Sequence, residues 1–463
     1  MYATGRKALL LAIALCLIAV SSSAWGLEKP DGEAQLVANP AFASSAGQPM
    51  PHEWTLQPLP VKDAYCRVRA VDGGLAVDAP EHPFGVGIVW QEVHGIEPKK
   101  GYAVDVLAKA EKIPSPCRSI LVRLTWTHSG KPLHPAGFMV HGPIAADAGL
   151  RFADVLGAPK EADGARLSLE LKWPQGGSVL WQRAGLRAAA LPPPRKVKIG
   201  TVYLRPRNST PQRNLRLFCD QVDEAGRLKL DIVCLPEAIL EFGTTKNGPQ
   251  TAEPIPGPTS QRLAQAARKN HLWLVAGLYE RDGAAVYNAA VLLDREGRIA
   301  GKYRKIHLPR EEWQMGITPG SCYPVFKTDF GTIAMQVCYD YFFPEEGSIL
   351  GLKGAEIVFA PTWGTTFKDQ DGRVEGENTF RVRARDNGIY LVPSVYDGNS
   401  MVIDPVGRVL ATSDGHEGLF WCEVDLSRRE PLPWVGHWRS VGPRDRMPAG
   451  YESLLGDPAE PRE

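Results

Sequence analysis

Three side chains with complementary chemistry follow apolar segments in the second half of the chain. Glu237 comes after DIVCLP, Lys305 lies within GKYRKIHLP, and Cys338 comes after AMQV. A carboxylate can take the proton of a thiol, and a neighbouring ammonium favours the thiolate and then a developing oxyanion. A lone cysteine is more often a small buried core residue, but the three types together predict nucleophilic catalysis by Cys338.

Two other arrangements compete for the same residues. His307 lies two positions beyond Lys305, so on a strand both side chains would face the same side. A Cys338–His307 pair would be like that of a cysteine protease, but no third group that would orient the histidine is visible. A metal site from His307, Asp340 and Glu345 lacks usable ligand spacing. We therefore expect no metal ligands.

The second half of the chain alternates predicted strands and helices. Residues 197–426 carry buried strands separated by amphipathic segments, which is typical of a layered α/β domain. Thr210, followed by proline, fits a helix start. Residues 258–270 have apolar positions on one helical face, and residues 294–297 predict a hairpin turn. The tail at 427–463 is rich in proline and arginine and is expected to wrap a neighbour or to fray.

The first half of the chain has a different pattern. Between residues 27 and 190, short alternating apolar runs are separated by glycine, proline and aspartate clusters, which predicts an all-β sandwich. A stiff proline linker follows at 191–196. Residues 39–42, 51–54 and 177–181 resemble parts of jelly-roll modules of the carbohydrate-binding type. Exposed tryptophans would suit stacking on a sugar, and five lie in this half: Trp54, Trp90, Trp126, Trp173 and Trp181.

The first 26 residues have the pattern of an export signal. A basic start at Arg6 and Lys7 precedes an apolar core at residues 9–20 and then small residues. The core is too short to cross a membrane as a helix. We expect a mature protein that begins near Leu27 and is exported to the periplasm or secreted.

The net charge limits the classes of binding partner, and the number of cysteines limits the possible disulfides. The formal net charge is +1, so nothing points to a nucleic acid or an anionic membrane as a partner. Seven cysteines follow the signal, and an odd number leaves at least one thiol unpaired. Cys66 and Cys117 could form a disulfide in an exported protein. Cys219 and Cys234 lie in apolar periodic segments and are expected in the core.

Five motifs occur in one order in the second half: LPE at 235–237, K-x-H-L-P at 305–309, CYDYFFPE at 338–345, ENTFRVRARDNGIY at 377–390 and S-x-x-I-D-P-x-G at 400–407. With these motifs, the second half resembles the nitrilase superfamily of carbon–nitrogen hydrolases. The resemblance implies a nitrilase-like, four-layer α-β-β-α sandwich, no cofactor, and a homodimer or higher homo-oligomer. It does not cover the β-rich first half.

The resemblance also implies roles for single residues. Glu237 would be the general base, Lys305 the lysine that stabilises the oxyanion, and Cys338 the nucleophile. Such enzymes often have a further glutamate after the lysine motif, and both Glu311 and Glu312 stand there. The spacing to the following WQMGITPG favours Glu312, which would hold the lysine and orient the leaving amine.

Other residues are expected to bind the substrate. The backbone N–H of Tyr339 would contribute to the oxyanion site, whatever its side chain does. Trp363, Tyr287, Asn288 and Trp313 are candidate walls of the pocket, although each of them could equally be a packing residue.

The substrate class follows from the residues after the nucleophile. Cys338, Tyr339 and Asp340 resemble the amidase and carbamoylase branches, whereas nitrilases more often have tryptophan and glutamate there. A small linear amide or N-carbamoyl compound is therefore the expected substrate. Use of the same triad by a nitrilase or an acyltransferase remains open, as does a glycan-binding surface protein with a degenerate enzyme domain.

Overall fold

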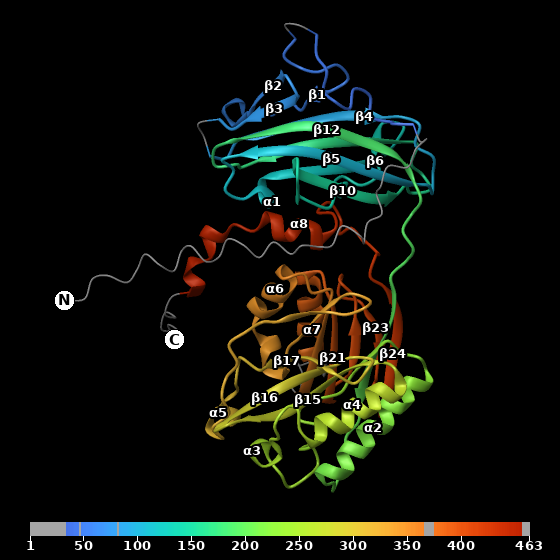
Figure 1. Cartoon of the computed structure of the whole chain (residues 1–463), viewed down its shortest axis with the longest axis vertical. Coiled ribbons are helices and arrows are strands. Elements are labelled where there is room, and N and C mark those ends of the chain that lie inside the picture. The colour runs from blue at the N-terminus through green and yellow to red at the C-terminus, as the bar shows by residue number, and fades with distance from the viewer. Residues whose placement is uncertain (1–33, 46–47, 81–82, 365–374, 456–463) are drawn as a thin grey trace, which may run out of the picture.

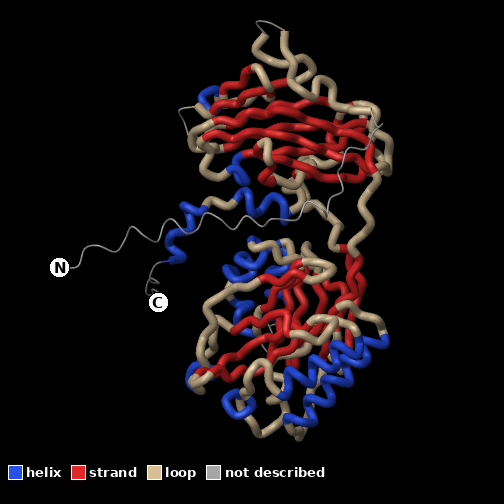
Figure 2. Tube along the Cα trace, in the orientation of Figure 1, coloured by secondary structure: helices blue, strands red, loops and turns tan. Residues whose placement is uncertain are grey.

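The computed structural model describes residues 34–45, 48–80, 83–364 and 375–455. Within these ranges the chain forms two bodies, each built on a pair of sheets, with one connection between them (Figure 1). The first body consists mainly of strands, and the second carries helices as well (Figure 2). The predicted export signal lies outside the described residues.

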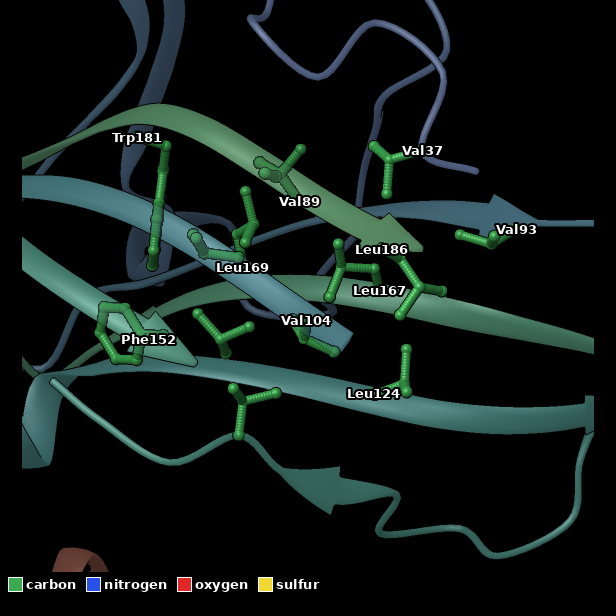
Figure 3. Packing of buried hydrophobic residues seen from close by; sticks show 14 of the residues in the cluster. Val37, Val89, Val93, Val104, Leu124, Phe152, Leu167, Leu169, Trp181 and Leu186 are labelled. Carbon is green, nitrogen blue, oxygen red and sulfur yellow. The ribbon is translucent and has the colours of Figure 1, made fainter. Parts of the chain in front are cut away.

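The first body is a sandwich of two six-stranded antiparallel sheets, as predicted. Its strands alternate in burial, which is clearest in β4, where every second side chain is buried. The core between the sheets includes Val104, Leu124, Phe152 and Trp181 (Figure 3). One sheet contains β1 (Thr55–Leu56), β4 (Val86–Val93), β11 (Gly164–Lys172), β6 (Ile120–His128), β7 (Lys131–Pro132) and β8 (Phe138–Met139). The other contains β2 (Arg67–Val71), β3 (Gly74–Asp78), β12 (Ser178–Ala189), β5 (Gly101–Glu111), β10 (Gly149–Gly157) and β9 (Ile144–Ala146), and two short helices are η2 (Lys62–Ala64) and α1 (Pro116–Ser119).

The tryptophans of this sandwich are mostly packing residues. Three lie in the core: Trp54, Trp126 and Trp181. Trp90 is half-buried, with the guanidinium of Arg166 4.1 Å from its ring centroid. Trp173 is 39 % exposed, and the Lys172 ammonium lies 5.0 Å from its ring centroid. One exposed ring beside a lysine is a small surface for stacking on a sugar.

The second body is built on two further six-stranded sheets. In each, central strands run parallel, and their side chains are buried on both faces because other layers cover the sheet. The first sheet contains β17 (Ile299–Arg304), β16 (Ala285–Leu293), β15 (Trp273–Asp282), β14 (Ile232–Cys234), β13 (Lys196–Tyr203) and β24 (Gly418–Asp425). The second contains β18 (Val325–Lys327), β19 (Thr332–Met335), β20 (Ile357–Gly364), β21 (Tyr390–Asp397), β22 (Met401–Ile403) and β23 (Val409–Thr412).

Helices cover the outer face of each sheet and complete four layers. On the first sheet, Phe218 and Leu263 pack from α2 and α4; on the second, Leu350 and Phe380 pack from α6 and α7. The two sheets pack on each other through side chains such as Ile333 of β19. The predicted four-layer α-β-β-α sandwich is therefore confirmed. Its helices are α2 (Pro211–Arg227), α3 (Gly248–Thr251), α4 (Pro258–Asn270), α5 (Arg310–Gln314), η3 (Cys338–Phe342), α6 (Pro344–Leu352) and α7 (Glu375–Asn387).

Local sequence signals fix several of these boundaries. The side chain of Thr210 accepts the N–H of Arg213 at 3.2 Å and caps α2, which begins at Pro211 as predicted. The helix predicted for residues 258–270 is α4 with the same limits. The hairpin predicted at residues 294–297 connects β16 to β17.

The C-terminal segment packs against both bodies. Arg429 forms a two-bonded ion pair with Asp154 of the first sandwich, at 2.6 and 2.9 Å. The indole N–H of Trp438 donates to the carbonyl of Asp386 on α7 at 2.6 Å, and Val441 packs against the first sandwich. Over its described part the tail therefore does not fray, but wraps its own two neighbouring bodies. Its elements are α8 (Trp438–Asp445) and η4 (Pro448–Leu455).

The cysteines of the described residues are all free thiols. Cys66 is buried and Cys117 is exposed, so the disulfide considered between them does not form. Cys219 and Cys234 are in the core, as predicted. In the parts of the chain that the structure describes, no helix has the length and apolar character needed to cross a membrane.

Candidate active site

Glu237 lies just beyond the end of β14, where the neighbouring strand comes unusually close. The chain leaves β14 at Cys234, and the N–H of Leu235 still donates to the carbonyl of Val275 at 2.8 Å. On β15, a Cβ atom added at Gly277 would lie 2.5 Å from the Cα atom of Glu237. Only glycine allows this approach of the two backbones. Glu237 is 3 % exposed.

Lys305 follows β17 and lies between two buried carboxylates. Its backbone N–H donates to the carbonyl of Asn288 at 2.8 Å and prolongs the pairing of β16 with β17. Its Nζ atom donates to Oε1 of Glu237 and to Oε1 of Glu312, both at 3.1 Å. Burial works to lower the pKa of Lys305, but the carboxylates of Glu237 and Glu312 raise it overall, so the ammonium stays charged.

Cys338 occupies a strained turn between β19 and η3. Its φ of +47° lies in the left-handed region, which costs a residue with a side chain about 1–3 kcal/mol and is typical of functional sites. The backbone N–H of Trp363 hydrogen-bonds its sulfur, and the carboxylate of Glu237 is within hydrogen-bonding reach. Burial and then Glu237 raise the pKa of the Cys338 thiol, while Lys305 lowers it by less. Lys305 therefore acts toward the thiolate, whereas burial and Glu237 act toward the neutral thiol.

Asn288 holds the two carboxylates together from β16. Its Nδ2 atom donates to Oε1 of Glu237 at 2.6 Å and to Oε1 of Glu312 at 2.5 Å. The hydroxyl of Tyr279 donates to Glu312 at 3.3 Å. Burial raises the pKa of Glu312, with Glu237 acting in the same direction and Lys305 against it. The amide and the ammonium offset the repulsion between two adjacent carboxylates.

Asp340 connects the turn of Cys338 to the segment that carries Lys305. One of its carboxylate oxygens accepts the N–H of Val337 at 3.0 Å, and the other accepts the N–H of His307 at 2.9 Å. Its side chain is fully buried. Because Val337 directly precedes Cys338 and His307 lies two residues after Lys305, one carboxylate fixes the thiol-bearing turn relative to the lysine.

A second buried network continues from Asp340. The possible ligand atoms of His307, Asp340 and Glu346 lie within 4.8 Å of one another. Nδ1 of His307 contacts Oδ1 of Asp340 at 2.9 Å and Oε2 of Glu346 at 3.3 Å, and the Tyr303 hydroxyl donates to both carboxylates. We interpret the group as an ion-pair network, because the histidine lies between two buried carboxylates that it contacts directly. Glu345, considered with the histidine from the sequence, is not part of it.

The comparison with protein families identifies the second body. The carbon-nitrogen hydrolase family model matches residues 198–433. That range contains the five site residues Glu237, Asn288, Lys305, Glu312 and Cys338. The chain belongs to the carbon–nitrogen hydrolase family. It is accordingly a hydrolase that acts on carbon–nitrogen bonds other than peptide bonds.

Relatives of this carbon–nitrogen hydrolase include several amidases. Omega-amidase NIT2 of Xenopus tropicalis is 29 % identical over 243 residues, which are 48 % of this chain and 87 % of the relative. A nitrilase of Pyrococcus abyssi is 31 % identical over 245 residues, 50 % of this chain and 90 % of the relative. Among solved structures, an amidase from Nesterenkonia sp. is 22 % identical with a TM-score of 0.47, covering 57 % of this chain and 98 % of the amidase.

The structure brings most of the predicted site residues of the hydrolase together. Asn288 contacts two of the carboxylates, so it is more than a pocket wall. Trp363 reaches the Cys338 sulfur through its backbone. Tyr339 is the second residue of η3, where a backbone N–H has no acceptor within the helix and is available to a ligand. Glu312 rather than Glu311 faces the lysine: Glu312 is 6 % exposed, and Glu311 is an exposed residue.

Two predicted pocket residues lie outside the site. Side chains alternate along β16, so Tyr287 points to the opposite face from Asn288 and packs against Arg304, 3.8 Å from its ring centroid. Trp313 follows Glu312 on α5 but is 57 % exposed, because consecutive helical residues point about 100° apart.

The His307 network predicts how the stability of this hydrolase depends on pH. Burial works to lower the pKa of His307, but hydrogen bonds and charges from Asp340 and Glu346 raise it to about 9. Burial and Asp340 raise the pKa of Glu346. His307 and Glu346 therefore bind more protons in the folded chain than in the unfolded chain. In the unfolded chain the pKa of a histidine is about 6.5. The free energy of unfolding should therefore fall as the pH rises from about 6.5 to 9.

Denaturant unfolding at several pH values measures this slope. His307→Gln should make it shallower, because the charged imidazole is gone while Glu346 still titrates, whereas His416→Gln at an exposed position should leave it unchanged. A slope of the opposite sign in the wild type, or an unchanged slope in His307→Gln, would contradict the assignment.

Proposed function

We propose that this carbon–nitrogen hydrolase cleaves a small linear amide or N-carbamoyl compound through a cysteine thioester. The observation that carries the proposal is the Nζ atom of Lys305 between the carboxylates of Glu237 and Glu312, beside the thiol of Cys338. A buried base, a buried cation and a strained thiol are the components that acyl transfer to cysteine requires.

The first half-reaction begins with the neutral thiol. Glu237 takes its proton as the sulfur attacks the carbonyl carbon, a C–S bond forms, and the carbonyl electron pair moves to oxygen. The ammonium of Lys305 and the N–H of Tyr339 stabilise this oxyanion. When the oxyanion collapses, the C–N bond breaks, and Glu237 returns its proton to the leaving nitrogen. Glu312 holds Lys305 and lies where it can orient that nitrogen.

The second half-reaction hydrolyses the thioester. Glu237 removes a proton from water as the water oxygen attacks the thioester carbon. The C–S bond then breaks to release the acid, and Glu237 returns the proton to the departing sulfur, which restores the thiol and the carboxylate. The same carboxylate thus serves both steps. In this scheme the thiol starts neutral, so the reaction depends on a general base rather than on a preformed thiolate.

An amide is preferred to the other substrates of such a triad. Tyr339 and Asp340 after the nucleophile support an amidase or carbamoylase, and several relatives are amidases by name. A nitrilase or acyltransferase is the alternative, since the same thioester serves both. Nothing among the described residues favours a glycan-binding role: a single tryptophan of the first sandwich, Trp173, is substantially exposed.

A substrate panel tests the proposed function. We expect ammonia release from short linear amides and from N-carbamoyl amines, at rates at least about ten times those from nitriles of the same chain length, because the oxyanion site is built for a carbonyl oxygen. Intact-mass spectrometry after rapid acid quench should show an acyl adduct on Cys338. Ammonia from nitriles alone, or acyl transfer to an added amine without hydrolysis, would replace the proposal by one of its alternatives.

Export and self-association complete the proposal. The basic start and apolar core of residues 1–26 support export to the periplasm or secretion. Apolar side chains exposed on η3, α6 and α7 support a homodimer or higher oligomer: Phe342, Leu352 and Val382. Cell fractionation with N-terminal sequencing, and light scattering of the purified protein, measure the two properties.

A further inference from the structure

Glu241 is a carboxylate next to the triad that the reaction above does not use. It lies four residues after Glu237, in the turn beyond β14, where its N–H donates to the carbonyl of Ala238 at 2.8 Å. Its Oε2 atom is buried and has no hydrogen-bond partner among the described residues. A buried acceptor without a donor is costly, and in native proteins such a group calls for a functional explanation.

The charges around Glu241 do not balance. Burial, followed by the carboxylates of Glu237 and Glu312, raises the pKa of Glu241 to about 7, and none of the groups that shift it is a cation. Lys305 is already shared between Glu237 and Glu312. Above about pH 7, the three carboxylates of Glu237, Glu241 and Glu312 share one buried ammonium, that of Lys305, and Oε2 of Glu241 has no donor among the described residues.

Aromatic rings adjoin this carboxylate. We call Phe242 and Trp363, whose side chains are both partly exposed, the aromatic wall, and the buried ring of Tyr396 supports it from the core. Phe242 stacks on Tyr396 with ring centroids 4.0 Å apart, and Trp363 lies 5.1 Å from Phe242 and 5.6 Å from Tyr396. Tyr396 is fully buried, its hydroxyl has no partner in the described part of the chain, and Glu241 contributes to raising its pKa.

The aromatic wall connects Glu241 to the reacting sulfur. Trp363 hydrogen-bonds Cys338 through its backbone while its ring forms part of the wall. The π faces of tryptophan and phenylalanine attract cations, and aromatic rings beside a carboxylate are usual elements of a site for an organic ammonium group. The unused acceptor and the rings thus favour the same kind of ligand.

We propose that the substrate of this site carries a cationic nitrogen, an ammonium or guanidinium group, which Glu241 and the aromatic wall hold while Cys338 attacks the amide carbon. The inference rests on the proposed hydrolase function and specifies its substrate class. The competing determinant is Arg205, whose guanidinium lies 5.9 Å from the Phe242 ring centroid; it would favour an anionic substrate instead.

Three amides of equal chain length separate these cases. They are 4-aminobutanamide, pentanamide and glutaramate, whose far ends are cationic, neutral and anionic. In the wild type, kcat/KM for the cationic amide should exceed that for pentanamide about 10- to 100-fold, which is the range for one charge-assisted contact. In Glu241→Gln this ratio should fall to within about threefold of unity, with a smaller change for pentanamide. The measured quantity is the ratio of kcat/KM for 4-aminobutanamide to that for pentanamide. A general loss of activity in the variant lowers both values equally and leaves this ratio unchanged.

The control is Glu311→Gln, an exposed carboxylate outside the site, which should keep the wild-type ratio. A wild-type enzyme that prefers glutaramate, or that does not distinguish the cationic from the neutral amide, overturns the inference without any variant. So does a Glu241→Gln variant that keeps the preference.

Binding without turnover separates this inference from the proposed function. Calorimetry with Cys338→Ala measures the affinity for 4-aminobutanamide and pentanamide, and then the effect of adding Glu241→Gln. Selective binding of the cation that depends on Glu241 supports the inference even if the wild type hydrolyses no amide. Equal affinity for both compounds contradicts it even if the wild type is an active amidase.

Discussion

The substitution Cys338→Ala is expected to lower ammonia release from a good amide substrate by at least about 10⁴-fold, since removing a catalytic nucleophile costs this much or more in comparable acyl-transfer enzymes. The loss should be in kcat, because the thiol forms a bond to the substrate only after binding. No acyl adduct should be detectable by mass spectrometry. Substrate affinity measured by calorimetry should change little, since Glu237, Lys305 and Glu312 remain.

The matched control for this substitution is Cys322→Ala. Cys322 is an exposed free thiol sixteen positions before Cys338, so its loss removes a cysteine without touching the site. It should retain wild-type kcat and KM. Activity in Cys338→Ala within tenfold of the wild type, with Cys322→Ala unaffected, would exclude the thioester mechanism.

Much of the hydrolase body is predictable from the sequence because its signals are local. The strands that precede Glu237 and Cys338 are marked by apolar runs, whereas β17 before Lys305 is not, and Thr210 marks a helix start through its own hydrogen bond. Glu237, Lys305 and Cys338 could be selected because a carboxylate, an ammonium and a thiol together provide the groups for one catalytic mechanism. The strands β14 and β17 run in the same direction, so their C-terminal ends lie at one edge of the first sheet, and Cys338 meets Glu237 there from the second sheet.

Two kinds of feature cannot be predicted from the sequence: the face of a strand or helix on which a side chain lies, and the contacts between residues far apart in the chain. Tyr287 and Asn288 are adjacent and equally suited to a pocket, and only strand parity directs Asn288 inward. Glu311 and Glu312 differ in the same way on a helix. The function of Asp340 depends on the backbone of residues more than thirty positions away, and Glu241 can be recognised only from the donor that it lacks.

The C-terminal segment illustrates the same limit on a larger scale. Its proline and arginine content is typical of a tail that frays, yet Arg429 forms an ion pair with Asp154, which lies 275 positions earlier in the chain. Composition describes how a segment behaves alone, whereas this segment is ordered by a buried carboxylate of the other body. That partner could not be inferred from the tail.

The substitution Lys305→Met is expected to lower both the catalytic rate and the stability of the fold. It should lower kcat/KM about 100- to 1000-fold, the usual effect of losing one oxyanion donor. It also leaves Glu237 and Glu312 buried without their cation, and breaking a buried ion pair costs about 3–5 kcal/mol. The lower melting temperature should be partly restored as the pH falls, because protonation neutralises the stranded carboxylates and Glu312 already has a raised pKa.

Lys302→Met on β17, the strand that directly precedes Lys305, supplies the control for charge and size. Lys302 pairs with Glu280, which keeps Arg304 as a partner, so this variant should retain kcat/KM and most of its stability. Activity assays with thermal unfolding at pH 5 and 7.5 compare the two variants. Since Lys305 is 1 % exposed and hydrogen-bonded to both carboxylates, the two losses should occur together. A stable Lys305→Met enzyme with wild-type kcat/KM would mean that the oxyanion is stabilised elsewhere, and normal stability with low activity would assign Lys305 to catalysis alone.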